Sequence, residues 1–232
     1  MPDPIAVDAL VFDAYGTLFD VHSVTAEAER RFPGTGAPLS QLWRTKQLEY
    51  SWLTGLMVAG TNAAGVPRPD FAELTANALD YALSSLGLIA DPEIRTRLLG
   101  EYRNLSPFAE VAGALAALAP RPRWILSNGT LAMLEPLVRK PGVSGHIDGI
   151  LSVDAAGAYK PHPRVYQLAV DALSLPPARI GFVSSNGWDA VGAKAFGFRT
   201  FWINRSGAPA ERHGPAPDRE LANLAELLAH LA

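Results

Sequence analysis

Short runs of apolar residues alternate along the chain with segments in which apolar residues recur at helical spacing. The runs that read as buried strands occupy residues 9–12, 124–126, 149–153, 180–183 and 201–203. Helical patterns lie between them, as in residues 163–173, where Val165, Leu168 and Ala172 share one face. Strands that alternate with helices predict a parallel sheet joined by right-handed crossovers.

One interval breaks this alternation. Roughly a hundred residues with helical periodicity separate the strand that ends near Asp13 from the next one, near Trp124, far more than one crossover needs. The sequence therefore predicts an inserted helical domain. We expect an α/β fold, a doubly wound and mainly parallel sheet, formed by residues 1–19 and 99–232, with a helical cap at residues 20–98.

Helix start signals occur inside this insertion. Asp70 stands three residues before Glu73, which is the spacing of a capping box, and an apolar stripe that includes Phe71 and Leu74 follows. These residues predict a helix that begins directly after Asp70.

Composition narrows the classes of function. The chain is 48% hydrophobic and 19% charged, which is typical of a soluble globular protein. Its net charge is −3 and neither sign forms a run, so nucleic acid and anionic lipid are not expected partners. The absence of cysteine excludes a disulfide framework, a thiol nucleophile and a thiolate metal site.

The location follows from the termini and the hydropathy of the chain. The first residues lack the basic stretch of a signal peptide, which predicts a cytoplasmic protein. Residues 50–67 carry no charge, but Gly60, Gly65 and Pro67 interrupt them, so no membrane helix is predicted there.

Polar side chains follow four of the predicted strands at the point where each strand ends. Residues 13–17 follow the first strand, residues 127–130 the second, Lys160 comes shortly after the third, and residues 184–189 follow the fourth. The carboxyl ends of parallel strands meet at one edge, where ligands bind in open α/β sheets. The sequence thus predicts one crevice lined by carboxylates, hydroxyls, an amide and an ammonium group.

In order and spacing, these segments resemble the haloacid dehalogenase superfamily and, within it, the L-2-haloacid dehalogenases. The segments that carry the resemblance are Asp13-Ala-Tyr-Gly-Thr17-Leu-Phe-Asp20, Ser127-Asn128-Gly129, Lys160-Pro161 and Ser184-Ser185-Asn186-Gly-Trp-Asp189. The similarity runs from about residue 9 to residue 203, and residues 42–50 resemble the cap of that family.

The superfamily as a whole would favour a phosphatase, because Asp13 could accept a phosphoryl group equally well. Phosphotransfer members usually carry Asp-x-Asp, and further acidic residues after the fourth strand hold Mg²⁺. Here Tyr15 replaces the second Asp, and Ser184-Ser185 leaves Asp189 as the carboxylate of that loop. Since Mg²⁺ requires several oxygen ligands and negative charge, the sequence argues against a metal and against phosphoryl transfer.

The resemblance implies hydrolysis of a 2-haloalkanoate in two steps. Asp13 attacks C2 opposite the halogen, halide leaves as an aspartyl ester forms, and water then cleaves the ester at its carbonyl carbon. The configuration at C2 inverts once, so an L-2-haloacid becomes a D-2-hydroxy acid. The haloacid and the halide ion are the expected ligands, and neither a metal nor a cofactor is expected.

For the first step, the resemblance implies three anion-binding positions. Arg44 of the cap and Asn128 receive the halide. Ser127, together with Arg44 and Asn128, contacts the substrate. Lys160 keeps Asp13 ionised. Taken alone, Arg44 reads as a solvated helix face and Lys160 as a surface residue, so these roles rest on the resemblance.

For the second step, the resemblance implies that Asp189, Asn186 and Ser184 hold and activate the water. The remaining expected site residues are Thr17, which orients the nucleophile, Tyr166, which supplies a hydroxyl, and the pocket walls Tyr15 and Trp188. For Trp188, core packing is as good an interpretation as ligand contact.

Two other functions stay open at this point. One is a Mg²⁺-dependent phosphatase or phosphonatase of the same superfamily, and the other is a non-catalytic binding protein with the same fold. The second is disfavoured because a structural role does not require Asp13, Lys160 and Asp189 around one crevice. The resemblance also implies a homodimer, with the uncharged residues 50–57 either at its interface or in the core of the cap.

Overall fold

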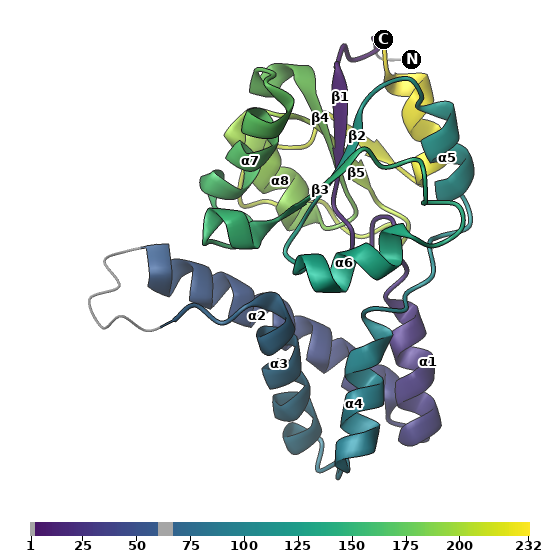
Figure 1. Ribbon diagram of the computed structural model, residues 1–232, viewed down its shortest axis with the longest axis vertical. Coiled ribbons are helices and arrows are strands. Elements are labelled where there is room, and N and C mark those ends of the chain that lie inside the picture. Colours follow the sequence, from purple (N-terminus) through teal and green to yellow (C-terminus); the bar gives the residue numbers. More distant parts are fainter. Residues whose placement is uncertain (1–2, 60–66) are drawn as a thin grey trace.

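The computed structural model describes residues 3–59 and 67–232 of the chain. Six parallel strands form one sheet in the order β3-β2-β1-β4-β5-β6 (Figure 1). The strands are β1 (Ala9–Phe12), β2 (Arg123–Ser127), β3 (Gly149–Ser152), β4 (Ile180–Ser184), β5 (Arg199–Ile203) and β6 (Arg219–Leu221). The first five confirm the predicted strands, whereas β6 is too short to show a pattern in the sequence.

Helices cover both faces of this sheet, which confirms the predicted doubly wound α/β fold. Helices α7 (Pro163–Leu173) and α8 (Gly187–Phe196) lie on one face, and α5 (Val111–Ala117) lies on the other beside the 3₁₀ helix η3 (Leu224–His230) (Figure 1). Because both faces are covered, every side chain of β1 is buried and the strand is continuously apolar.

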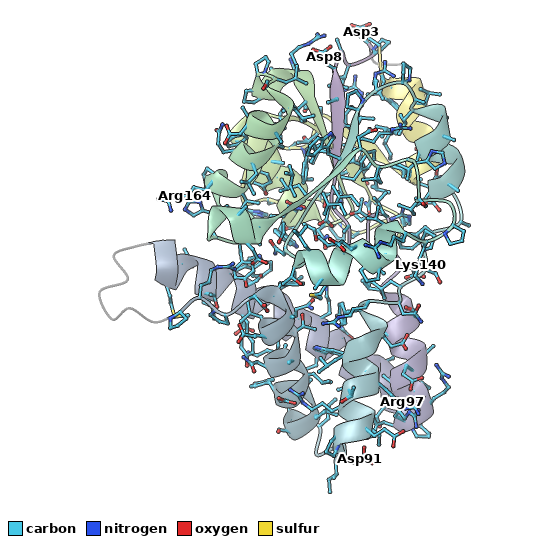
Figure 2. All side chains as sticks on the ribbon, viewed as in Figure 1. Asp3, Asp8, Asp91, Arg97, Lys140 and Arg164 are labelled. Carbon is cyan, nitrogen blue, oxygen red and sulfur yellow. The ribbon has the colours of Figure 1, made fainter. Side chains whose placement is uncertain are left out.

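Four helices lie beyond the carboxyl ends of the strands. They are α1 (His22–Arg31), α2 (Gly36–Ala59), α3 (Phe71–Ser85) and α4 (Pro92–Glu101), and α6 (Leu131–Val138) lies between them and the sheet (Figure 1). Asp3 and Asp8 mark the opposite end of the molecule, while Asp91 and Arg97 mark the outer end of the helices (Figure 2). The division into a core of residues 1–19 and 99–232 and a cap of residues 20–98 stays a prediction.

Helix α3 shows how the sequence determines these helices locally. The Asp70 carboxylate accepts a hydrogen bond from the Glu73 N–H at 2.8 Å, and the Glu73 carboxylate accepts one from the Asp70 N–H at 2.8 Å. This is the predicted capping box. Phe71, Leu74 and Ala78 follow on the buried face, so the helix packs through the predicted apolar stripe.

The strand order reverses at β1, with β2 and β3 on one side and β4 to β6 on the other. Phe12 pairs in register with Ile125 of β2 and Val183 of β4, so the residues that follow these positions reach the same edge. This switch point is where open α/β sheets bind ligands. The register therefore places Asp13 beside Ser184 and near the end of β2.

The chain passes between the sheet and the helical layer in two segments that lie side by side. The Asp20 N–H donates to the Ser106 carbonyl at 2.8 Å, and the Phe108 N–H donates to the Leu18 carbonyl at 3.1 Å. These bonds join the outgoing and returning segments next to the loop that carries Asp13.

Within residues 3–59 and 67–232, no helix combines the length and apolar character that would let it cross a bilayer. The interruption of the uncharged segment that we predicted at Gly60 and Gly65 lies outside the described residues.

Candidate active site

Three side chains donate hydrogen bonds to the carboxylate of Asp13, directly after β1. Oδ2 accepts from Thr17 Oγ1 at 3.1 Å and from Asn186 Nδ2 at 2.9 Å, and Oδ1 accepts from Lys160 Nζ at 3.0 Å. Asp13 is 6% exposed. The three donors come from separate loops and hold the carboxylate in one orientation.

The Lys160 ammonium lies between two carboxylates. Its Nζ is 2.9 Å from Oδ2 of Asp189 in addition to its contact with Asp13. Burial by itself lowers the pKa of Lys160, but the two carboxylates outweigh it, so the pKa of this ammonium is raised above its usual value. Lys160 is therefore a cation at neutral pH.

Asp189, in the first turn of α8, is held by further donors. Its Oδ1 accepts from the Tyr166 hydroxyl at 2.9 Å, and its Oδ2 accepts from Ser184 Oγ at 3.1 Å. Burial raises the pKa of Asp189, an effect that Lys160 opposes. Burial and the Asp189 carboxylate together raise the pKa of Tyr166 well above its usual value, which keeps its hydroxyl a donor.

The arrangement of charge does not suit a magnesium ion. The Lys160 ammonium occupies the position between Asp13 and Asp189, and the side chain at Tyr15 brings a hydroxyl in place of a carboxylate. Among the residues that the structure describes, no three or more His, Cys, Asp or Glu side chains are grouped to hold a metal. The donor set thus lacks the oxygen ligands that Mg²⁺ requires.

Ser127 and Asn128 follow β2 on the other side of Asp13. The Asn128 carbonyl oxygen Oδ1 accepts a hydrogen bond from the Lys160 backbone N–H at 3.1 Å. Ser127 Oγ accepts one from the Gly129 N–H at 3.2 Å. With these acceptors engaged, the amide NH₂ and the serine O–H are the groups available to bind an anion.

Arg44 reaches the site from α2, and Gln47 holds it there. Arg44 Nη1 donates to Gln47 Oε1 at 2.6 Å, and Gln47 Nε2 donates to Thr75 Oγ1 of α3 at 2.7 Å. Gln47 is fully buried. Gln47 was not predicted as a site residue, although its position three residues after Arg44 on one helix indicates that the two side chains can contact each other.

Eight of the predicted site residues line one small cavity. They are Asp13, Tyr15, Arg44, Ser127, Asn128, Lys160, Asn186 and Trp188, joined by Leu48 and Phe71. Its free volume is about 10 Å³, roughly the space of one water molecule. The other four predicted residues do not line this cavity. Thr17 donates a hydrogen bond to Asp13, and Asp189 accepts one from Lys160. Tyr166 and Ser184 both donate to Asp189.

A larger cavity of about 610 Å³ adjoins this small cavity, and Lys160 and Trp188 line both. Its wall is mostly apolar and includes Trp52 of α2, whose ring packs edge-on against Trp188 with centroids 5.3 Å apart. Trp188 therefore borders both spaces, and ligand contact is compatible with its place in the fold.

Comparisons with known proteins agree with this geometry. The haloacid dehalogenase-like hydrolase family matches residues 7–197. Haloacetate dehalogenase H-2 of Moraxella sp. (strain B) is 46% identical, over 91% of this chain and 92% of its own. (S)-2-haloacid dehalogenase of Pseudomonas sp. (strain YL) is 44% identical, over 94% of this chain and 91% of its own.

A solved structure extends the comparison to three dimensions. The L-2-haloacid dehalogenase of Xanthobacter autotrophicus with covalently bound chloropropionic acid superposes with a TM-score of 0.85 at 41% identity, over 95% of this chain and 96% of that one. The sequence matches and the shared fold lead to the same family. This chain belongs to the haloacid dehalogenase-like hydrolases and, among them, to the L-2-haloacid dehalogenase family.

Proposed function

We propose that this protein hydrolyses L-2-haloalkanoic acids to D-2-hydroxy acids, with inversion at C2 and through an ester on Asp13. The observation that carries the proposal is the buried Asp13 carboxylate, oriented by Lys160, Thr17 and Asn186 at the wall of a small cavity. A carboxylate is a weak nucleophile in water, so orientation and the exclusion of water supply much of its reactivity.

In the first step, an oxygen of Asp13 attacks C2 as the carbon–halogen bond breaks. Asn186 and Thr17 hold Oδ2, and the Lys160 ammonium contacts Oδ1. The electron pair of the broken bond leaves with the halide, so the ester forms without any proton transfer. Inversion follows because attack comes from the side opposite the halogen.

Donors from both layers of the molecule face the two anionic groups of the substrate. The Arg44 guanidinium and the Asn128 amide line the cavity and receive the departing halide, while the Ser127 hydroxyl binds the substrate carboxylate. Because Gln47 and the Lys160 backbone engage one side of Arg44 and Asn128, the remaining donors are already oriented.

In the second step, water attacks the carbonyl carbon of the ester, which returns Asp13 and releases the hydroxy acid. Asp189, supported by Ser184 and by the Tyr166 hydroxyl, takes one proton of the water, which then passes to the alkoxide oxygen of the leaving hydroxy acid. The other proton of the water goes to solvent. Lys160 lies against both Asp13 and Asp189, so it stabilises the negative charge that develops on the ester oxygen.

The small cavity must admit a substrate larger than the water-sized space it contains. The adjoining 610 Å³ cavity shares Lys160 and Trp188 with it and is the approach that we propose. Rotation of the Trp188 ring away from Trp52 would join the two spaces. The helical layer then acts as a cap that excludes water during the attack.

A homodimer in the cytoplasm is part of the same proposal. On α2, Leu53, Leu56 and Met57 are 47%, 74% and 71% exposed, an apolar surface suited to contact with a second copy. Light scattering on the purified protein tests the dimer, and a monomer mass at micromolar concentration would contradict it.

Halide release from the two enantiomers of 2-chloropropionate tests the function itself. With EDTA present, we expect chloride from the L form alone and D-lactate as the product. Chloride from neither enantiomer, together with Mg²⁺-dependent hydrolysis of a phosphate ester, would overturn the proposal in favour of a phosphatase.

A further inference from the structure

Arg205, in the loop after β5, uses all five of its N–H donors next to the catalytic site. Nη1 donates to the Gly16 carbonyl at 3.0 Å and to Ser185 Oγ at 2.8 Å, and Nη2 donates to the Thr17 carbonyl at 2.9 Å. Nε and Nη2 both donate to Oε1 of Glu110, at 2.9 and 2.7 Å. We propose that Arg205 is a positioning residue, which sets the reactivity of Asp13 by fixing the loops that hold it.

Arg205 contacts both residues of the hydrogen bond between Ser185 and Thr17. Thr17 Oγ1 donates to the Asp13 carboxylate at 3.1 Å and accepts from the Ser185 N–H at 2.8 Å. Arg205 binds the Thr17 carbonyl on one side and the Ser185 side chain on the other. It therefore fixes the separation of the loops after β1 and β4, on which the orientation of Asp13 depends.

A third segment joins the same guanidinium. Arg205 stacks on the Phe108 ring at 3.8 Å from its centroid, and Glu110 follows two residues later. Phe108 itself donates its N–H to the Leu18 carbonyl, so this returning segment is hydrogen-bonded to the segment that follows Asp13. Arg205 therefore links the segment that returns from the helical layer to the loop that carries Asp13.

The chemistry of this position requires arginine. Its acceptors lie on three segments, and a planar fork of five donors reaches them at once, whereas a lysine ammonium offers three donors on one atom. Glu110 balances the positive charge of Arg205. The guanidinium therefore holds protein groups in place and does not serve as an anion site.

Arg205→Met and Arg205→Lys test the inference, which rests on the proposed dehalogenation. Chloride release from L-2-chloropropionate is followed in single turnovers, with enzyme in excess and above KM, so that the rate constant reports intact sites and not the folded fraction. We expect a fall of at least tenfold for Arg205→Met and at least threefold for Arg205→Lys, with the Kd for substrate within about twofold of the wild type.

Arg179→Met provides a matched control. Arg179 donates from Nε to Asp8 Oδ2 at 2.7 Å in an exposed two-point ion pair. Asp8 lies at the end of the sheet away from the helical layer (Figure 2). This variant should keep a wild-type single-turnover rate constant while it also loses an arginine ion pair.

The outcomes separate the two proposals. If the wild type releases no halide, the proposed function fails. If the wild type is active and Arg205→Lys keeps its rate constant, or Arg205→Met loses only melting temperature, Arg205 is a structural ion pair and the inference is overturned. If Arg205→Met does not fold, Arg205→Lys decides on the same criterion.

Discussion

The Lys160 ammonium donates a hydrogen bond to the Asp189 carboxylate over 2.9 Å, although the two residues are only 1% and 0% exposed. Buried charges persist where partners compensate them, and this ammonium also serves Asp13. One positive charge against two negative charges leaves the group formally anionic. An anionic substrate would therefore depend on further donors, which is the role that we propose for Arg44 of α2.

Replacement of Lys160 by Met should remove activity and destabilise the fold. Two buried carboxylates then lack their cation, for which we expect a loss of about 3–5 kcal/mol in the free energy of unfolding at pH 8. Without the ammonium, the pKa of the buried Asp189 rises further in the folded state, so the folded variant takes up protons more readily than the unfolded chain. The loss should shrink as the pH falls from 8 to 5.

Urea denaturation at both pH values measures this change. In the wild type, Lys160 is protonated in the folded and the unfolded state across this range, because its pKa is raised from an already high value. Its pairing is therefore fully present there and is lost only as the pH rises through the folded pKa. Lys194→Met, which removes the partly buried Asp218 ion pair, should cost about 1 kcal/mol. An equal loss for Lys160→Met at pH 8 and pH 5 would contradict the explanation.

Gln47→Leu should weaken catalysis through Arg44. The leucine removes the acceptor of the 2.6 Å bond from Arg44 and the donor to Thr75, so the guanidinium loses its fixed position. We expect kcat/KM to fall about tenfold, in line with loss of a hydrogen bond to a charged group. Gln47→Glu keeps the acceptor for Arg44 and should retain more activity than Gln47→Leu. Steady-state halide release that ranks the two variants the other way would count against a positioning role.

Gly129→Ala should impair the pocket. A Cβ at this position would lie 2.9 Å from Cε2 and 3.0 Å from the hydroxyl oxygen of Tyr15, so the buried ring must shift. We expect a loss of about 1–3 kcal/mol in stability together with a raised KM, because Tyr15 lines the cavity.

Gly113→Ala is the matched control, since nothing lies within 4 Å of its Cβ in the exposed part of α5. This control should be stabilised by about 0.5–1 kcal/mol. Thermal melting and substrate kinetics on both variants check these values. A Gly129→Ala enzyme with wild-type KM would mean that Tyr15 does not shape the pocket.

The sequence predicted the fold where local pattern and tertiary structure agree. The capping box of Asp70 and Glu73 and the apolar run of β1 are local signals, and both occur as expected. Strand β6 has three residues and is specified by pairing with β5, so no sequence pattern predicts it. The segments after the strands were predicted to meet because parallel strands share one edge, and seven of their residues line one cavity.

Contacts that depend on distant segments were not predictable in this way. Arg205 gathers acceptors from residues 16, 17, 110 and 185, and only the folded structure brings these segments together. In the sequence, Arg205 merely precedes a glycine- and proline-rich tail. Arg44 was expected at the site through resemblance, whereas its support by Gln47 and Thr75 depends on the packing of α2 against α3.

The fate of solvent oxygen in a single turnover distinguishes attack by Asp13 on carbon from direct attack by water. Enzyme in excess over L-2-chloropropionate is allowed to react once in H₂¹⁸O, and the lactate and the peptide that contains Asp13 are weighed by mass spectrometry. Because water attacks the ester carbonyl, we predict ¹⁸O in the Asp13 carboxylate and unlabelled lactate. Lactate that carries ¹⁸O, with Asp13 unlabelled, would show that water displaces the halide directly and would contradict the account.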